Sequence, residues 1–429
     1  MEIGADSFEQ MTNEASPSIQ QQIAVIEQLD IKAYTALYSG RTKIKRLLFI
    51  GEKCDDVSMQ LEALRMAYDE VKKGEDTELF KKVVKEIGGR LGPDYGLDLS
   101  WIQEVDRHAR MTKEKLEHER SSMSIERKYI GYMDSGDFYY ARGALGDALK
   151  NYQRAYDYCR VAPQFISTCE PVILVSLEMG NFSYVWSYIH KATSHFEKAI
   201  PSHISVAKLQ CAAGLANLEV NQYKNAAQEF LDVTPLLGDS YSQVIACQDV
   251  GTYGGLCALA TFDRAELKVK VIDNAKFQQF LELVPQVRKL ILDFYSSRYR
   301  LCMDYLTYLK PNLLLDIHMH DHVEILYTRI RNKALIQYAY PYSSLDMKIM
   351  ATVFKTDVTE LQQDIETLIT TNQLKARIDS VNKVLYTHRE NVRNSTFRQV
   401  LETGDMLERD ARATMHRVNI LKSRYGRRA

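Results

Sequence analysis

Residues 133–155 read MDSGDFYYARGALGDALKNYQRA, and this stretch decides the fold. Small residues let two helices approach closely, and aromatic side chains fill the groove between one helix pair and the next. The pattern therefore predicts an antiparallel helix pair that buries one face against a neighbouring pair. The residues at the required helical spacing are Gly136, Tyr139, Gly143, Leu145, Ala148, Tyr152 and Ala155.

Three later stretches repeat the pattern: EMGNFSYVWSYIHKA (178–192), AAGLANLEVNQYKNAAQEFLDV (212–233) and the weaker YGGLCALATFDRAEL (253–267). From Gly143, the equivalent positions Gly180, Asn221 and Thr261 follow at steps of 37, 41 and 40 residues. These steps exceed the roughly 34 residues of a regular tetratricopeptide array. We expect degenerate tetratricopeptide-like repeats over 121–310; the alternative is a non-repetitive helical bundle with coincidental glycines.

The segments on either side of the first repeat are helical as well. Apolar residues recur at steps of three and four from Leu29 onward, which predicts an N-terminal helical region over 29–120. LGPDYGLDLS (91–100) is a turn-rich break, and a charged helix over Leu99–Tyr129 should follow it. QVRKLILDFYSSRYRLCMDYLTYL (286–309) predicts one long helix closed by Pro311. Residues 1–28 are polar and acidic, and we expect a disordered tail there.

The chain changes character over 311–390. SLDMKIMATVF, TDVTELQQDIETLITTNQ and KARIDSVNKVLYTH predict helix, helix and a two-stranded hairpin, which is the order of a winged helix. An inward face is expected from Leu345, Ile349, Phe354, Leu361, Ile365 and Leu368, and the strands from Ile378, Val384 and Tyr386. The predicted fold class is therefore mainly all-α, an α-α superhelix followed by a winged-helix subdomain with a small β hairpin.

The last segment, 391–429, predicts a bundle helix and a basic tail. Apolar or small residues alternate at steps of three and four, as in a heptad seam, and a single helix cannot bury such a stripe by itself. Gly404 and Thr414 weaken the seam, which favours a mixed helical bundle over a two-stranded coil. The seam residues are Phe397, Val400, Gly404, Leu407, Ala411, Thr414, Val418, Leu421 and Tyr425.

Composition limits the class of protein. A chain of 429 residues with 45% hydrophobic residues exceeds a single core, and its net charge of −1 provides no global attraction for nucleic acid or an anionic membrane. Its seven cysteines are scattered without a CxxC pair, which indicates buried thiols in a reducing compartment. No membrane span and no targeting segment stand out, so we expect a cytoplasmic and nuclear protein.

DIHMHDHVE (316–324) holds three of the ten histidines, and His318 and His322 at i and i+4 could chelate zinc on a helix. His318 and His320 also form the HxH of JAMM-type isopeptidases. The spacing of that pattern places its last ligand, an Asp, at Arg331, which has no lone pair to offer. We therefore expect polar surface here, with no metal, no cofactor and no catalytic residue.

A winged helix can also read DNA, as a nucleic-acid-binding regulator would. Its recognition helix needs cations or amides toward the groove. Residues 357–373 contain four acids, Asp357, Glu360, Asp364 and Glu366, and no Lys or Arg. The hairpin adds only Lys375, Arg377 and Lys383. Negative charge against phosphates opposes binding, so we expect no nucleic acid as a partner.

Helical repeats running into a winged helix and a terminal helix resemble the PCI family of the proteasome lid, the signalosome and a translation initiation factor. Within it the chain resembles the subunit-one members of the COP-nine signalosome, particularly those of plants, over about residues 29–425. The stretches that carry the likeness include LDIKAYTALYSGRTKIKRLLFIGEKC (29–54), YGGLCALATFDRAELKVKVID (253–273), NLLLDIHMHDHVEILYTRIRNKALIQY (312–338) and ARIDSVNKVLYTHR (376–389).

The resemblance implies a non-catalytic scaffold subunit of an isopeptidase complex that removes a ubiquitin-like modifier from cullins and so regulates cullin-RING ubiquitin ligases. The metalloprotease centre would lie on another subunit. The paralogous proteasome lid subunit is the alternative, although GRTKIKRLLFI and GGLCALATFDR fit the signalosome better. The implied partners are other PCI subunits, through the hairpin edge and the terminal helix, and a cullin-RING ligase through the repeat arm. The implied interface residues are Lys375, Arg377, Ile378, Val384, Leu385, Tyr386, Phe397, Val400, Leu407, Val418 and Leu421.

Overall fold

The computed structural model describes residues 30–121, 125–196, 201–387 and 392–425, and the predicted acidic tail lies outside them. The chain forms two compact units, Met1–Lys333 and Ala334–Ala429. In the described part no helix is both long and apolar enough to cross a membrane.

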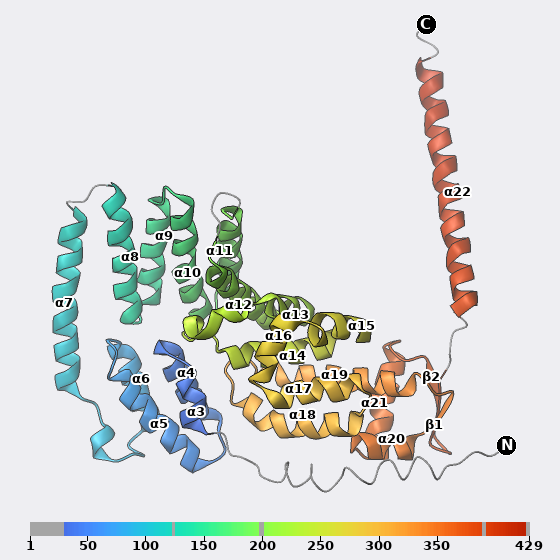
Figure 1. Cartoon of the computed structure of the whole chain (residues 1–429), viewed down its shortest axis with the longest axis horizontal. Helices are drawn as coiled ribbons and strands as arrows, with labels where there is room; N and C mark the ends of the chain where they lie inside the picture. The colour runs from blue at the N-terminus through green and yellow to red at the C-terminus, as the bar shows by residue number, and fades with distance from the viewer. Residues whose placement is uncertain (1–29, 122–124, 197–200, 388–391, 426–429) are drawn as a thin grey trace. The chain divides into compact units, whose positions relative to one another are not determined.

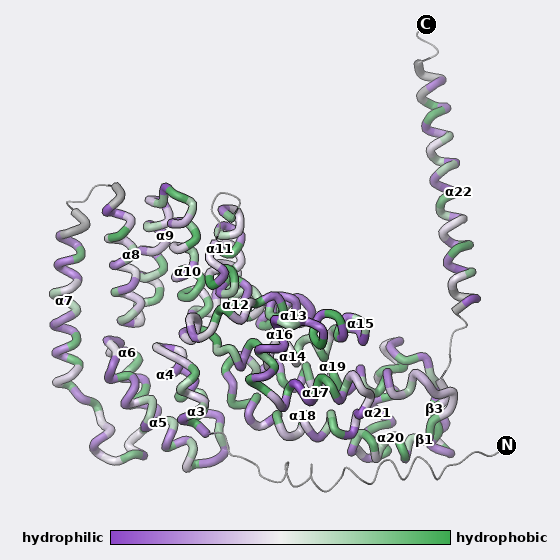
Figure 2. The backbone as a smooth tube through the Cα atoms, in the orientation of Figure 1, coloured by the Kyte–Doolittle hydropathy of each residue, from purple (hydrophilic) through white to green (hydrophobic). Residues whose placement is uncertain are grey.

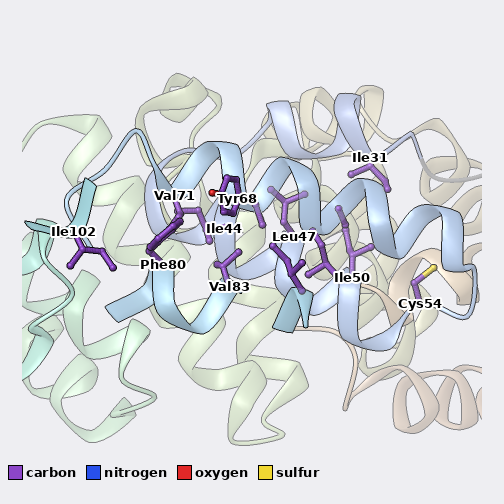
Figure 3. Packing of buried hydrophobic residues seen from close by; sticks show 14 residues of the cluster. Ile31, Ile44, Leu47, Ile50, Cys54, Tyr68, Val71, Phe80, Val83 and Ile102 are labelled. Atoms are coloured by element: carbon purple, nitrogen blue, oxygen red, sulfur yellow. The ribbon is translucent and has the colours of Figure 1, made fainter. Parts of the chain in front are cut away.

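The first unit begins with an N-terminal layer of helices that share their own hydrophobic core (Figure 3). Aspartates at positions 30, 56 and 76 cap three of these helices by accepting hydrogen bonds from first-turn amides. The predicted break at 91–100 holds a short 3₁₀ turn, Pro93–Tyr95. The layer comprises α3 (Ile31–Ala36), α4 (Gly40–Lys53), α5 (Val57–Val71), α6 (Thr77–Ile87) and α7 (Leu99–Ser121).

The repeat arm follows as antiparallel helix pairs, with α8 to α11 side by side in Figure 1. The residues used to count the repeats, Gly143, Gly180 and Asn221, sit at the turns with φ of 75°, 69° and 61°. Thr261 lacks such a turn and ends its helix, so the fourth repeat is the irregular one. The helices are α8 (Ile125–Ala141), α9 (Leu145–Asp157), α10 (Ala162–Glu178), α11 (Phe182–Ser194), α12 (His203–Glu219), α13 (Tyr223–Asp232), α14 (Cys247–Thr261) and α15 (Arg264–Leu267).

Two predicted long helices are wrong in their bounds. The charged helix ends at Ser121, and α8 begins at Ile125. The helix predicted over 286–309 is two helices, because Ser297 has a φ of 61° and turns the chain between them. Pro311 does not close the second helix, since it lies in the last turn, where only one backbone bond is lost. The helices of this region are α16 (Ala275–Glu282), α17 (Pro285–Tyr295), α18 (Tyr299–Leu314) and α19 (Val323–Ala339).

The second unit contains the predicted winged helix, with a third strand that the sequence analysis missed. The antiparallel sheet has the order β1-β3-β2. Ile349, predicted to face inward, is 58% exposed, because the buried stripe of its helix runs through Met347, Met350, Ala351 and Phe354. The elements are β1 (Ser344–Asp346), α20 (Met347–Phe354), α21 (Val358–Thr370), β2 (Ala376–Asp379) and β3 (Val384–Thr387).

The chain ends in α22 (Val392–Tyr425), a helix of 34 residues. Figure 2 shows hydrophobic and hydrophilic positions alternating along its length. Its mean composition is polar, but the apolar residues return at heptad spacing, so the helix carries a stripe that it cannot cover by itself.

Candidate functional site

The winged-helix sheet places the predicted interface residues differently from a two-stranded hairpin. Val384, Leu385 and Tyr386 lie on β3, which pairs with β1 on one side and β2 on the other. Their backbone groups are therefore used within the sheet. The edges are β1, which is only three residues long and runs directly into α20, and β2.

The register shows which groups of β2 are open. The Met347 amide donates to the Lys383 carbonyl and the Thr387 amide to the Ser343 carbonyl, at 2.9 and 3.1 Å. Along an antiparallel strand the backbone hydrogen bonds of successive residues point alternately to one side and the other. Leu385 therefore bonds toward β1, and its two neighbours, Val384 and Tyr386, bond toward β2. On β2 the residues opposite those neighbours are Arg377 and Asp379. The backbone groups of Ala376 and Ile378 therefore point away from the sheet.

The side chains divide between the two faces of the sheet. Leu385 is fully buried, and its cross-strand partners Leu345 and Ile378 share its face. Arg377 and Tyr386 face each other on the opposite side, where Tyr386 is 49% exposed. Lys375 is exposed just before β2. The predicted residues thus form one open backbone edge and one exposed face beside it.

Helix α22 supplies the second candidate surface. Phe397, Val400 and Leu407 are 62%, 62% and 72% exposed, and Val418 is 44% exposed. The side chain of Leu421 lies outside the part that the structure describes. Two exposed apolar residues not predicted from the sequence, Leu401 and Met415, lie beside the seam and widen the stripe, whereas the exposed Met406 and Ile420 lie on another face of the helix. A stripe of this width fits a groove between several helices better than a single partner helix.

The histidine-rich stretch is not polar surface, and that prediction is wrong. Residues 315–322, here called the connector, form turns between α18 and α19, with Asp316 and His322 only 5% exposed. His322 meets the Tyr223 hydroxyl through its Nδ1 at 3.1 Å, and burial lowers its pKa. His318 lies 3.6 Å from Glu219. The described residues contain no group of three or more His, Cys, Asp or Glu placed to hold a metal ion.

Asp316 is buried because it belongs to an ion cluster around Arg46, which the sequence analysis did not identify. Arg46, on α4, has no exposed side-chain surface; its Nη2 donates to Asp249 at 3.1 Å and its Nη1 to Asp316. The Tyr253 hydroxyl donates to Asp316 at 2.6 Å. Burial is the largest single influence and would raise the pKa of Asp316. The Arg46 guanidinium, His318 and the hydrogen bonds from Tyr253 and Arg46 together outweigh it, so the pKa falls. Arg46 lies within the GRTKIKRLLFI stretch quoted above, but nothing in the sequence pattern distinguishes this cation from its neighbours.

Comparisons with known proteins agree with this architecture. The family model described as 26S proteasome subunit RPN7 matches residues 98–270, and the PCI domain matches 302–389. The COP9 signalosome complex subunit 1 of Arabidopsis thaliana is 57% identical over 94% of this chain and 92% of its own length. This chain belongs to the COP9 signalosome subunit 1 family.

Two less similar relatives extend the comparison, one within this family and one from the proteasome. Subunit 1b of Drosophila melanogaster is 35% identical over 96% of this chain and 89% of its own length. The 26S proteasome non-ATPase regulatory subunit 6 of Dictyostelium discoideum is 21% identical over 77% of the chain. The family predicted from the sequence is confirmed, and the proteasome lid alternative is the weaker match.

Proposed function

We propose that this chain is a scaffold subunit of a COP9 signalosome, which joins sibling PCI subunits through the open edge of β2 and the apolar stripe of α22. The observation that carries the proposal is the stripe, because no element of the described second unit covers Phe397, Val400 or Leu407. Burying a large apolar side chain stabilises a complex by roughly 1.5–3 kcal/mol, and the stripe offers several of them.

The scaffold role concerns assembly and not chemistry. The complex would remove a ubiquitin-like modifier from cullins with a metalloprotease centre on another subunit, and thereby regulate cullin-RING ligases. The connector histidines are tied to Tyr223 and Glu219 in this chain, which supports a structural role for them. The repeat arm is the candidate contact for the ligase, and we place the complex in the cytoplasm and the nucleus.

The edge is tested best at Ala376. Ala376→Pro removes an outward-pointing amide at the first residue of an edge strand, a position that proline tolerates. Leu385→Pro would instead break the central strand and cannot separate assembly from folding. Val381→Ala is the matched control, because Val381 lies in the turn after β2, is 89% exposed, and its truncation leaves the β2 backbone intact.

Both variants are co-expressed with sibling PCI subunits, and the chain incorporated into the purified complex is quantified by mass spectrometry. We expect Ala376→Pro to lower incorporation several-fold and Val381→Ala to change it little, with the circular dichroism of both chains unchanged. Normal incorporation of a correctly folded Ala376→Pro chain would show that β2 is not the joining edge.

A further inference from the structure

The boundary between the N-terminal layer (α3–α7) and the rest of the first unit differs in kind from the interior of either part. The layer has its own apolar cluster, drawn from residues 31–102. The repeat arm has a separate cluster, drawn from residues 148–216. The two clusters share no buried residue, and among the described residues Leu315 of the connector is the one apolar residue from beyond the layer that packs against the N-terminal cluster.

The contacts across this seam are mostly polar and originate from α3, α4 and the turn between them. Ser39 meets Ser242 twice, by a backbone hydrogen bond of 3.1 Å and by hydroxyls 2.9 Å apart. The Thr42 hydroxyl donates to the Gln243 carbonyl. Lys45 pairs with Glu178 at 2.9 Å. Such a boundary resembles a polar interface between domains more than the interior of one domain.

Open pockets along the seam mark places where its two sides do not pack closely. Two of them, with volumes of about 480 and 430 Å³, are both lined by Lys45 and Ile317. A third, of about 430 Å³, is lined by Arg41, Ile44 and Gln243. Each pocket is half open to solvent, so close apolar packing is not continuous along this boundary.

What fixes the seam is the buried ion cluster. The side chain of Arg46 is completely inaccessible, and its guanidinium stacks on the Tyr38 ring at 4.0 Å from the centroid. Its two carboxylate partners come from different segments of the other side, Asp249 in the first turn of α14 and Asp316 in the connector. The hydroxyl of Tyr38 also donates to Asp249, at 2.7 Å.

A buried ion pair contributes little net stability, but the loss of one partner leaves the others charged and unpaired in a poor solvent for charge. Without Arg46, two carboxylates would remain close together at the seam. Both carboxylates are nearly buried in the closed structure, and opening the seam would bring water to them. Opening would uncover Leu315, which packs on the N-terminal cluster, but the buried residues of each cluster stay together and α7 still packs on α8.

We propose that Arg46, Asp249 and Asp316 form an electrostatic latch, and that the N-terminal layer swings away from the repeat arm as a folded body when the latch is broken. The latch is a conformational device independent of the assembly surfaces on the second unit. It acts through charge balance, so removing the charges on both sides should leave the seam closed.

The test measures thiol labelling in the full-length chain, site by site, by mass spectrometry. Thr42→Cys places a reporter thiol at the seam, where the native threonine is only 8% exposed. Cys54 reports on the core of the N-terminal layer and Cys169 on the core of the repeat arm, since both are buried. All further substitutions are made in this Thr42→Cys background.

Adding Arg46→Met should raise labelling at position 42 roughly a hundred-fold or more, the factor expected when a buried pair loses one partner, while Cys54 and Cys169 stay protected. Adding Asp249→Asn and Asp316→Asn to Arg46→Met should bring labelling back to within a few-fold of the parent. Lys43→Met is the control, because Lys43 pairs with Glu70 inside the layer and does not cross the seam.

Four results would overturn the proposal. The first is unchanged labelling at position 42 in Arg46→Met, and the second is a parallel rise at Cys54, which would mean that the layer unfolds and does not swing. The third is labelling in the charge-free triple variant that remains as high as in Arg46→Met. The fourth is a rise of the same size in Lys43→Met, which would show that the effect is not specific to the latch.

Discussion

The close approach of α8 and α9 provides a sharp test of the repeat architecture. A Cβ added at Gly136 would lie 2.5 Å from Cδ1 and 2.8 Å from Cζ of Tyr152, well inside ordinary contact. The ring cannot move aside, because Tyr152 is 1% exposed and its hydroxyl donates to Asp137 at 2.7 Å. Gly136→Ala therefore forces the two helices apart.

The magnitude follows from two opposing terms. Overpacking a filled core costs about 1–3 kcal/mol, and a clash with a fixed ring belongs at the upper end. Replacing glycine by alanine in a helix returns about 1 kcal/mol. The net loss should be about 2 kcal/mol, which corresponds to a factor of roughly 30 in a local equilibrium. Gly146→Ala, in the same helix pair, meets no atom within 4 Å and is the matched control.

Hydrogen exchange of the α8 and α9 amides is the suitable assay, since a chain of this size does not unfold in two states. Protection should fall roughly 30-fold in Gly136→Ala and stay the same or rise in Gly146→Ala. Tyr152→Leu makes room for the new methyl group, so the double variant should be less destabilised than the sum of the single variants by about 1 kcal/mol. Strict additivity, or equal effects of the two alanines, would refute the close-packing argument.

Two further predictions concern the exposed helix and the buried histidine. Leu407→Asp with Val418→Asp should abolish co-purification with sibling subunits. The thermal stability of the isolated chain should not change, because both residues are exposed. Glu408→Ala with Arg412→Ala removes an exposed ion pair on the same helix and is the control; equal retention of both variants would remove α22 from the interface. Burial lowers the pKa of His322. Below the ordinary histidine pKa of about 6.5 the unfolded chain therefore binds a proton that the folded chain does not, and stability should fall as the pH drops through this range. The dependence of Tm on pH between 7 and 5.5 should be shallower in His322→Gln, and an equal slope would contradict this assignment.

Local patterns predicted the repeats because the decisive contacts are local. Gly136 and Tyr152 belong to one helix pair, as do Gly214 and Phe230, and small residues at such crossings are visible in the sequence. The same local logic failed at Pro311 and Ile349. Helix phase decides which residues face the core, and a shift of one position exchanges Ile349 for Met350.

Strand β1 was missed for a related reason. Ser344–Asp346 is too short to show alternation, and Asp346 caps α20, so the sequence presents only a helix start. The strand exists because β3, some forty residues later, supplies a partner for it. The missing strand changed the functional interpretation, since it moved Leu385 from an open edge to the centre of the sheet.

The Arg46 cluster could not be predicted from local pattern at all. Arg41, Lys43, Lys45 and Arg46 look alike in sequence, yet Arg41 and Lys45 pair with Glu178, Lys43 pairs with Glu70, and only Arg46 among these four is fully buried. Asp249 and Asp316 are separated from Arg46 by more than two hundred residues in the chain. Which cation becomes buried depends on tertiary structure, so a basic helix face reads as solvated surface until the opposing carboxylates are placed.

The two proposed assembly surfaces are each modest, and their combination would explain how they hold a subunit. The open edge of β2 offers the backbone groups of two residues, and a hydrogen bond contributes about 1 kcal/mol net. The stripe on α22 offers apolar area but little geometric selectivity. When both lie on one chain, binding at one surface raises the effective concentration at the other, so the strand can set the register while the helix supplies affinity. An exposed apolar helix with no such register would associate indiscriminately, and for that reason the polar edge matters to the scaffold as much as the stripe does.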